Sequence, residues 1–426
     1  MVDTLGQDVP YARAPKEMAI KISCATCHDP KRAGSDFTSA PNTVSIGAGW
    51  YDVNSEQTVN AAYYPLLYWN GRTDSLWSQA AQVSESGVSM NGTRLNTFWQ
   101  IYDDLHYRAA YIALFGDAWP TVPTTAEFPR IGKPGQAVFD NMSVENKQAV
   151  TRVWVNFAKA IAAYEYTLIS RDSAFDTFVM EGSASTAISP AAKRGARLFV
   201  GKASCIDCHS GPLFSDGGFH DISVPQVGDH VPTVADCPST NTRCDCTPGN
   251  EKGTCLPSGA WSGLLKLSAS VEPATGINFN NTRRDSMWSD DPYDASRAHY
   301  YAPPTDTSLK GAWRTPSLRD VALTPPYMHT GYYRTLEEVV WHYNVGGAAS
   351  GSRQFDKTPA HAVQVKPLGL RDDEQADLVE FLKTLTGKAL DASQTTKPPV
   401  ADAGAPPAPP DAGSPPDAGV SDAASQ

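Results

Sequence analysis

Two copies of one short pattern, C-x-x-C-H, carry the clearest chemistry in this sequence. The residues are Cys24, Cys27 and His28 in SCATCHDP, and Cys205, Cys208 and His209 in SCIDCHSG. In this pattern both thiols bond to the vinyl groups of a haem, and the histidine binds its iron. A redox dithiol or half of a zinc site in each place would leave both histidines unexplained. The sequence therefore predicts two covalently bound haems c.

Four more cysteines crowd into a segment rich in Pro, Thr, Asn and Gly: Cys237, Cys244, Cys246 and Cys255. Two disulfides that pin an inserted loop explain this spacing better than a metal site does. Disulfides and covalent haem both require an oxidising compartment, which indicates the bacterial periplasm or the cell exterior. The first residues, MVDTLGQDVPYARAP, lack the basic and apolar regions of a signal peptide, so we expect the native precursor to carry one that is removed.

Composition limits the size and the partners of the protein. Its 426 residues, 41% of them hydrophobic, suffice for two domains with sizeable cores. The net charge of −11 and the lack of a lysine or arginine run disfavour a nucleic-acid partner and suit a positively charged protein or a neutral small molecule. No apolar run approaches the roughly eighteen residues that a membrane helix needs.

Helices must position the two motifs, because strong strand signals are scarce. Residues 143–170 predict a long helix with one buried face. That face consists of Val150, Val153, Trp154, Phe157, Ile161 and Tyr164. Ser189 and Pro190 predict the N-cap and first turn of a helix that leads into the second haem motif.

A third helix is expected at residues 371–386, capped by Asp372 or Asp373 and ended by Gly387. Its buried stripe would be Leu378, Phe381, Leu382 and Leu385. The distance between the haem motifs suits one haem per domain, in a mainly α fold. The expected division is a first haem domain at residues 1–165, a second at 166–388 and a tail at 389–426. The Pro/Ala/Asp/Gly-rich tail cannot bury apolar surface and should be disordered.

Four stretches resemble the bacterial di-haem cytochrome c peroxidase and MauG family. They are ISCATCHDP, YWNGRTDSLWSQA, AKRGARLFVGKASCIDCHSGPLFSDGGFHDISVP and GAWRTPSLRDVALTPPYMHTGYYRTLEEVVWHYNVGG. The resemblance covers nearly all of residues 15–388 and implies two all-α cytochrome-c-like domains. It also implies an N-terminal haem that meets hydrogen peroxide and a C-terminal haem that handles electrons.

The first departure from the peroxidase pattern concerns the ligands of the N-terminal haem. Many peroxidases of the family carry a histidine in a SIGHGW-like stretch that caps this haem, whereas the stretch here reads SIGAGW. Ala48 cannot bind iron, so the resemblance implies a five-coordinate haem held by His28 alone, as in MauG-type members. His106 is the nearest histidine in sequence that could replace the missing ligand.

The second departure concerns the haem bound by His209. The methionine that supplies the other ligand in the peroxidases falls at Tyr343, and MauG-type members carry tyrosine there. Locally, TLEEVVWHYN predicts a helix with a capping box beginning at Thr335, so a core tyrosine is the alternative. Met328 and His342 are the rival ligands. An anionic phenolate would favour the oxidised iron and lower the reduction potential.

The resemblance also points to residues around the open haem. Trp69 would be an aromatic relay between the haems, and Gln79 a pocket amide. The family's pocket glutamate, which shuttles a proton during peroxide cleavage, falls at Ser89. Glu85 could take its place if the loop folds differently. The alternatives are a core tryptophan and an exposed loop glutamate.

A calcium site between the domains is implied by matches at Asn54 and at the carbonyls of Thr324 and Pro326, since oxygen ligands suit a hard cation. Three functions remain open. The first is a MauG-type enzyme in which peroxide produces a high-valent di-haem state that oxidises an aromatic side chain of a partner protein. The second is a cytochrome c peroxidase that draws electrons from a small cytochrome, and the third is a non-enzymatic electron carrier. Ala48 argues against the carrier, and Tyr343 favours the first function, whereas a pocket without an acid at Ser89 favours the carrier.

Overall fold

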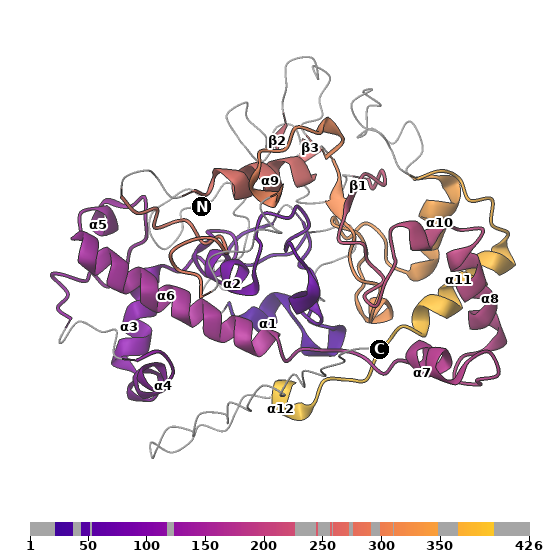
Figure 1. Cartoon of the computed structure of the whole chain (residues 1–426), viewed down its shortest axis with the longest axis horizontal. Helices are drawn as coiled ribbons and strands as arrows, with labels where there is room; N and C mark the ends of the chain where they lie inside the picture. Colours follow the sequence, from indigo (N-terminus) through magenta and orange to yellow (C-terminus); the bar gives the residue numbers. More distant parts are fainter. Residues whose placement is uncertain are drawn as a thin grey trace, which may run out of the picture.

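The computed structural model of the chain consists of helices joined by long loops (Figure 1). It describes residues 22–36, 44–51, 53–116, 123–225, 244–245, 256–257, 259–271, 276–290, 299–309, 311–347 and 365–395. Within these ranges the strands form only two-residue antiparallel pairs, β1 (Phe219–His220) with β4 (Trp313–Arg314) and β2 (Cys244–Asp245) with β3 (Leu256–Pro257). The prediction of a mainly α fold is confirmed.

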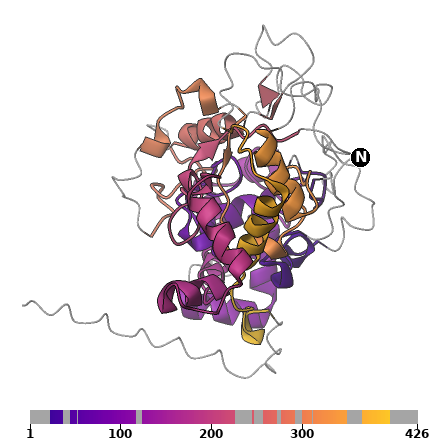
Figure 2. The ribbon, with the colours of Figure 1, turned by 90° about the vertical axis from the view of Figure 1, so that its right-hand side faces the viewer.

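The helices form two main groups, one in each half of the molecule (Figure 1). Figure 2, seen from the right-hand side of Figure 1, has the second group in front. The first group is α1 (Cys24–Cys27), η1 (Pro30–Arg32), η2 (Ala61–Tyr63), α2 (Leu76–Glu85), α3 (Arg94–Asp103), α4 (Leu105–Phe115), α5 (Ala137–Asp140) and α6 (Val144–Glu165). The helices that follow are α7 (Ala174–Glu181), α8 (Pro190–Val200), η3 (Cys205–Asp207), α9 (Gly259–Ala269), η6 (Thr307–Leu309), η7 (Val321–Leu323), α10 (Leu336–Val345), α11 (Asp372–Lys383) and α12 (Ala392–Thr395). Among the described residues, no helix is both long and apolar enough to cross a membrane.

The long helix predicted from the 143–170 pattern is α6. Ser143 caps it, because its hydroxyl accepts a hydrogen bond from the backbone N–H of Asn146 at 3.2 Å. Val150 and Trp154 are almost fully buried and pack in the cores that α6 forms with α2 and α3. The predicted face is correct except at its end, since Tyr164 is 47% exposed.

Helix α8 begins as predicted, with Ser189 at its N-cap and Pro190 in its first turn. It packs closely against α11, where a Cβ atom on Gly195 would lie 2.0 Å from the carbonyl oxygen of Asp377. Glycine is therefore required where α8 crosses α11. Cys205 of the second haem motif, which follows α8, packs against the core that the α11 residues belong to.

Helix α11 confirms the predicted stripe, since its members are buried in one core: Leu378, Phe381, Leu382 and Leu385. Its ends were predicted wrongly. Arg371 occupies the N-cap, so Asp372 and Asp373 lie within the first turn, where their charges favour the helix dipole. The helix ends at Lys383, before Gly387 is reached.

Residues 54–85 and 314–345 adopt the same local structure without a gap. Each stretch contains a 3₁₀ helix, then an isolated bridge, and then a helix with a hydroxyl N-cap, Ser75 for α2 and Thr335 for α10. The capping box predicted at Thr335 is confirmed. This repeat means that each position of residues 54–85 has a counterpart in residues 314–345.

The two repeats also contact each other in equivalent ways. The backbone N–H of Asn54 donates to the carbonyl of His329 at 2.7 Å, and the N–H of Arg314 donates to the carbonyl of Trp69 at 2.8 Å. Asn54 and Arg314 are counterparts in the repeat, as are Trp69 and His329. The interface between the haem domains is therefore formed by matched pairs of residues.

The boundaries of the domains differ from the expected division. Residues 276–290 follow the second haem motif in sequence but pack in the first domain, where Trp288 joins the core of Trp77 and Trp154. Thr282 and Ser78 share a hydroxyl hydrogen bond of 2.9 Å. The first domain is thus completed by a segment from the C-terminal half of the chain.

The first residues of the predicted tail are part of the described structure. Residues 392–395 form α12, and Tyr164 at the end of α6 donates a hydrogen bond to the carbonyl of Gln394. The remainder of the tail lies outside the described residues. The side chains of the four-cysteine segment, with their predicted disulfides, also lie outside them.

Candidate haem sites

The two motif histidines are oriented in the same way. His28 Nδ1 lies 2.7 Å from the carbonyl oxygen of Gly34, and His209 Nδ1 lies 2.8 Å from that of Phe214. A carbonyl can only accept, so Nδ1 carries the hydrogen and Nε2 keeps its lone pair for a metal. Burial lowers the pKa of both histidines, which favours this neutral form. Both residues fit the iron of a haem.

The motif cysteines also suit haem attachment. Burial raises the pKa of Cys27 and of Cys205 to about 12, so the thiols are protonated rather than thiolate ligands or redox nucleophiles. Cys208 lies with Asp216 and His220 in a cluster that could hold a metal ion. Because a thioether bond would occupy Cys208, and Asp216 already pairs with His220 at 2.8 Å, we assign no metal to that cluster.

The segment with Ala48 lies against the loop that contains Ser89. The thiol of Cys27 is 3.4 Å from the carbonyl of Ile46, which places the segment beside the first haem motif. The N–H of Ala48 then donates to the carbonyl of Ser89 at 2.7 Å. A Cβ atom on Gly47 would lie 2.5 Å from the same oxygen, so the contact requires glycine. The two departures from the peroxidase pattern at this haem are therefore neighbours.

Tyr51 is a member of this pocket that the sequence analysis missed. Its hydroxyl is hydrogen-bonded to the hydroxyl of Ser89, which is buried. Burial raises the pKa of Tyr51, whereas the nearby Arg72 guanidinium acts in the opposite direction. That guanidinium lies 3.2 Å from the centroid of the Tyr68 ring. The sequence offers one sign of this role, namely that Tyr51 lies three residues after Ala48.

The repeat gives independent information on the ligands of the first haem. The counterpart of Tyr343 in the first domain is Val83, whose side chain has no ligand atom. His106, the proposed substitute, is exposed near the start of α4, where its ring contacts Tyr107. Figure 1 shows α4 at the lower edge of the first domain, separated from α1 in the middle of the molecule. These positions support an open first haem.

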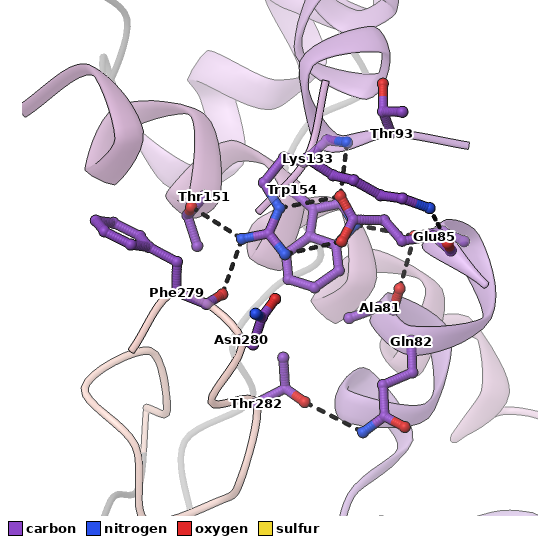
Figure 3. A network of polar contacts seen from close by, with 12 residues as sticks. Ala81, Gln82, Glu85, Thr93, Lys133, Thr151, Trp154, Phe279, Asn280 and Thr282 are labelled. Carbon is purple, nitrogen blue, oxygen red and sulfur yellow. Dashed lines mark hydrogen bonds and ion pairs between the residues drawn. The ribbon is translucent and has the colours of Figure 1, made fainter. Parts of the chain in front are cut away.

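Gln79 and Glu85 lie on the same helix, α2, but in different surroundings. Gln79 is partly buried, and its backbone carbonyl accepts a hydrogen bond from Tyr68 at 3.3 Å. Glu85 forms a bidentate pair with Arg94: Nε to Oε1 measures 3.0 Å and Nη2 to Oε2 measures 2.8 Å. Figure 3 shows Glu85 at the centre of this network. The alternative of an exposed loop glutamate is wrong, because its side chain is 12% exposed.

Trp69 lies at the interface of the two domains. Its indole N–H donates to the carbonyl of Asn54 at 2.9 Å, and its ring centroid is 6.2 Å from that of His329. The His329 ring in turn stacks on Trp313 at 4.1 Å. This position suits a relay between haems, although a structural role at the interface explains the same contacts.

Tyr343 lies beside the second haem motif. Burial raises its pKa, and the neighbouring Cys205 and Cys208 thiols act in the same direction. A raised pKa favours the protonated phenol, whereas a bound ferric ion would favour the phenolate, because it replaces the phenolic proton. His342, a rival ligand, has both ring nitrogens engaged, with the Tyr333 hydroxyl at 2.7 Å and the Ile222 carbonyl at 2.9 Å. Met328 is partly buried and packs against the second-domain core.

The candidate calcium ligands receive partial support. The side-chain oxygen of Asn54 is buried and has no hydrogen-bond partner among the described residues. A buried oxygen of this kind costs about 1–3 kcal/mol unless a cation or water binds it. In the described part of the chain, no hydrogen bond joins Asn54 to Thr324 or Pro326.

Comparisons with known proteins agree with this geometry. The profile of the di-haem cytochrome c peroxidase family matches residues 18–185. Cytochrome-c peroxidase IdrP1 of Denitromonas iodatirespirans is 30% identical over 363 residues, which cover 85% of this chain and 76% of that protein. The methylamine utilization protein MauG of Methylorubrum extorquens is 27% identical over 366 residues, covering 85% of this chain and 72% of that protein.

A solved structure shows the same fold. The diheme peroxidase BthA from Burkholderia thailandensis E264 has a TM-score of 0.57 and 19% identity, covering 93% of this chain and 92% of that one. Sequence similarity over most of the chain and two equivalent haem-binding motifs lead to one conclusion. The chain belongs to the di-haem cytochrome c peroxidase family, the oxidoreductases that act on peroxide and include MauG.

Proposed function

We propose that this chain is a MauG-type enzyme of the periplasm, which uses hydrogen peroxide to oxidise an aromatic side chain of a partner protein. The bound haems supply the redox chemistry, namely the reduction of peroxide and the storage of two oxidising equivalents. The proposed location rests on covalent haem attachment, which takes place in an oxidising compartment.

The observation that carries the proposal is the position of Tyr343. The partly buried phenol lies near Cys205 and Cys208, and the rival His342 is held by two other partners. As a phenolate ligand, Tyr343 would stabilise oxidised iron and lower the potential of the second haem. A haem of low potential accepts electrons poorly from small cytochromes but can hold an oxidising equivalent.

Residues of the first pocket would bind peroxide and move its proton. Ala48 and Val83 carry no ligand atom, so neither segment would supply a second ligand to a haem iron held by His28. The hydrogen-bonded hydroxyls of Ser89 and Tyr51 can hold a proton and return it to the leaving oxygen. Gln79 would supply an amide that orients peroxide.

Residues of the interface would connect the two haems. Trp69 is anchored by its hydrogen bond to Asn54 and would carry electrons between the domains. The orphaned side-chain oxygen of Asn54 would bind calcium together with the carbonyls of Thr324 and Pro326, and would hold this interface rigid. Elemental analysis of the purified protein tests the calcium assignment.

The second candidate is a cytochrome c peroxidase that draws electrons from a small cytochrome. Relatives with this name, such as IdrP1, support it. The electron carrier is less well supported, because Ala48 and Val83 would leave an open iron that a carrier does not need.

Replacement of the phenol distinguishes the two enzymes. We expect Tyr343→Met to raise the reduction potential of the second haem, because a thioether favours ferrous iron. Potentiometry should show this shift, and turnover of peroxide with a reduced small cytochrome should persist or increase. Tyr327→Phe, which changes a buried tyrosine of the second-domain core, is the control. An unchanged potential in Tyr343→Met would make Tyr343 a core residue and place the cytochrome c peroxidase first.

A further inference from the structure

Tyr333 and His342 form a buried pair next to the second haem site. Tyr333 precedes α10 and His342 lies on it; they are 5% and 0% exposed. The Tyr333 hydroxyl is 2.7 Å from His342 Nδ1, and the ring centroids are 5.2 Å apart. A phenol and an imidazole at this distance share one strong hydrogen bond.

The direction of that hydrogen bond is fixed by the other side of the imidazole. His342 Nε2 lies 2.9 Å from the carbonyl oxygen of Ile222, which can only accept. Nε2 therefore carries the ring hydrogen, and Nδ1 presents its lone pair to Tyr333. The phenol is the donor, so its proton already points at a base.

The pair is in contact with the proposed iron ligand. The ring centroids of His342 and Tyr343 are 5.4 Å apart, and on the other side those of Tyr333 and Tyr332 are 4.8 Å apart. Four aromatic rings thus lead from the second haem site to Tyr332, which is partly exposed. At these separations electrons pass readily between neighbouring rings.

The first domain lacks an equivalent pair. The counterparts of Tyr333 and His342 in the repeat are Thr73 and Gln82, and Gln82 is hydrogen-bonded to the hydroxyls of Ser78 and Thr282. Neither threonine nor glutamine can be oxidised by one electron under these conditions. At the matched positions of the described residues, the pair therefore occurs in the second domain and not in the first.

We propose that Tyr333 and His342 form a redox site that donates one electron to the second haem after peroxide has oxidised the enzyme. The electron leaves the Tyr333 ring and reduces the oxidised haem centre by one equivalent. The phenolic proton moves along the hydrogen bond to His342 Nδ1. The products are a neutral tyrosyl radical and an imidazolium that keeps its bond to Ile222, and an electron returned to Tyr333 reverses both transfers.

The surrounding core explains why the histidine is needed. Tyr333 packs among Tyr327, Leu336 and Val340, where an oxidised phenol could not release its proton to water. A phenol that loses an electron becomes a very strong acid, so its oxidation is favourable only where a base can take the proton, and His342 Nδ1 lies 2.7 Å away. Tyr327 is buried in the same core, but no described residue accepts a hydrogen bond from its hydroxyl. It serves as the matched control.

The test is electron paramagnetic resonance of the di-haem protein, frozen at intervals after one equivalent of peroxide. The optical bands of the haems in the same samples report that peroxide has oxidised them, so the result does not depend on any partner protein. We expect a tyrosyl signal that narrows when the protein contains ring-deuterated tyrosine. The signal should be lost in Tyr333→Phe and kept in Tyr327→Phe.

Tyr333→Phe removes one oxygen atom and should leave the fold and the resting haem spectrum intact. Since the variant lacks the internal donor, the optical signature of the oxidised haems should also persist longer than in the natural protein. Oxidised haem bands without any tyrosyl signal would overturn the proposal. A tyrosyl signal of full intensity in Tyr333→Phe would do the same, because it would place the radical elsewhere.

Discussion

Glu85→Gln separates a structural role of this carboxylate from a catalytic one. In the structure Arg94 donates to Glu85 through its backbone N–H, Nε and Nη2, at 2.7, 3.0 and 2.8 Å. The Arg94 side chain is 1% exposed and also donates to the Phe279 carbonyl at 2.8 Å. The pair therefore joins the end of α2 to α3 and to the segment that completes the first domain.

The expected cost follows from this geometry. Glutamine keeps one acceptor oxygen, but its NH₂ group must face a guanidinium N–H, and the buried charge of Arg94 loses its partner. Breaking a buried ion pair from one side costs about 3–5 kcal/mol. For a domain of this size, such a loss lowers the unfolding midpoint by about 6–20 °C. Asp103→Asn, in the exposed pair with Arg130, should cost no more than about 1 kcal/mol.

Thermal and guanidinium unfolding of the haem-containing protein measure this effect. Stopped-flow absorbance after peroxide addition measures the chemistry, at a temperature where the variant is folded. If Glu85 is structural, the peroxide reaction of the variant keeps nearly its natural rate. A proton shuttle contributes about 10²–10⁴-fold. An unchanged midpoint combined with a hundredfold slower reaction would refute the structural role of Glu85 and restore it as the pocket acid.

Further substitutions examine the open pocket and the end of α6. The resting protein should show one high-spin and one low-spin ferric haem by electron paramagnetic resonance, and Ala48→His should convert the high-spin signal to low spin. Ser89→Ala and Tyr51→Phe should each slow the reaction with peroxide in stopped-flow measurements, because each breaks the hydroxyl pair, whereas Ser84→Ala should not. Burial raises the pKa of Glu165 to about 7, so the folded state favours its protonated form. The contribution of this group to folding stability is therefore full below about pH 4.5 and is lost as the pH rises through 7, where the buried carboxyl must ionise. Because glutamine stays neutral, Glu165→Gln should raise the free energy of unfolding at pH 8 by about 3 kcal/mol in guanidinium unfolding.

Local signals in the sequence predicted the helices well. Ser189 and Thr335 cap the helices that follow, as predicted, because a hydroxyl before a helix satisfies N–H groups within a few residues. The ends of α11 were less predictable. Asp372, Asp373 and Glu374 all suit the start of a helix, so the sequence does not identify the N-cap. The helix then ends at Lys383, before Gly387, and helix ends are hard to predict to within one or two residues.

Contacts between distant segments could not be predicted from one sequence. Glu85 pairs with Arg94 across a loop. Arg94 also donates a hydrogen bond to the backbone carbonyl of Phe279, which is far away in the chain. The pattern around Glu85 shows only a charged residue at a helix end. Tyr51 was missed for the same reason, since its partner Ser89 is brought to it by backbone bonds between two loops.

The repeat accounts for how one framework can hold two different haem sites. Both domains use the same order of 3₁₀ helix, bridge and capped helix, so the backbone around each haem is nearly fixed. Difference must then come from side chains at matched positions. Val83, at the position that matches Tyr343, has no ligand atom, and Gln82, at the position that matches His342, cannot act as a base. In our proposal these two differences leave the first iron open and restrict the proton acceptor to the second domain. If the proposed roles are correct, Val83→Tyr should supply a second ligand to the first haem, and Tyr343→Val should remove one from the second haem, as electron paramagnetic resonance would show.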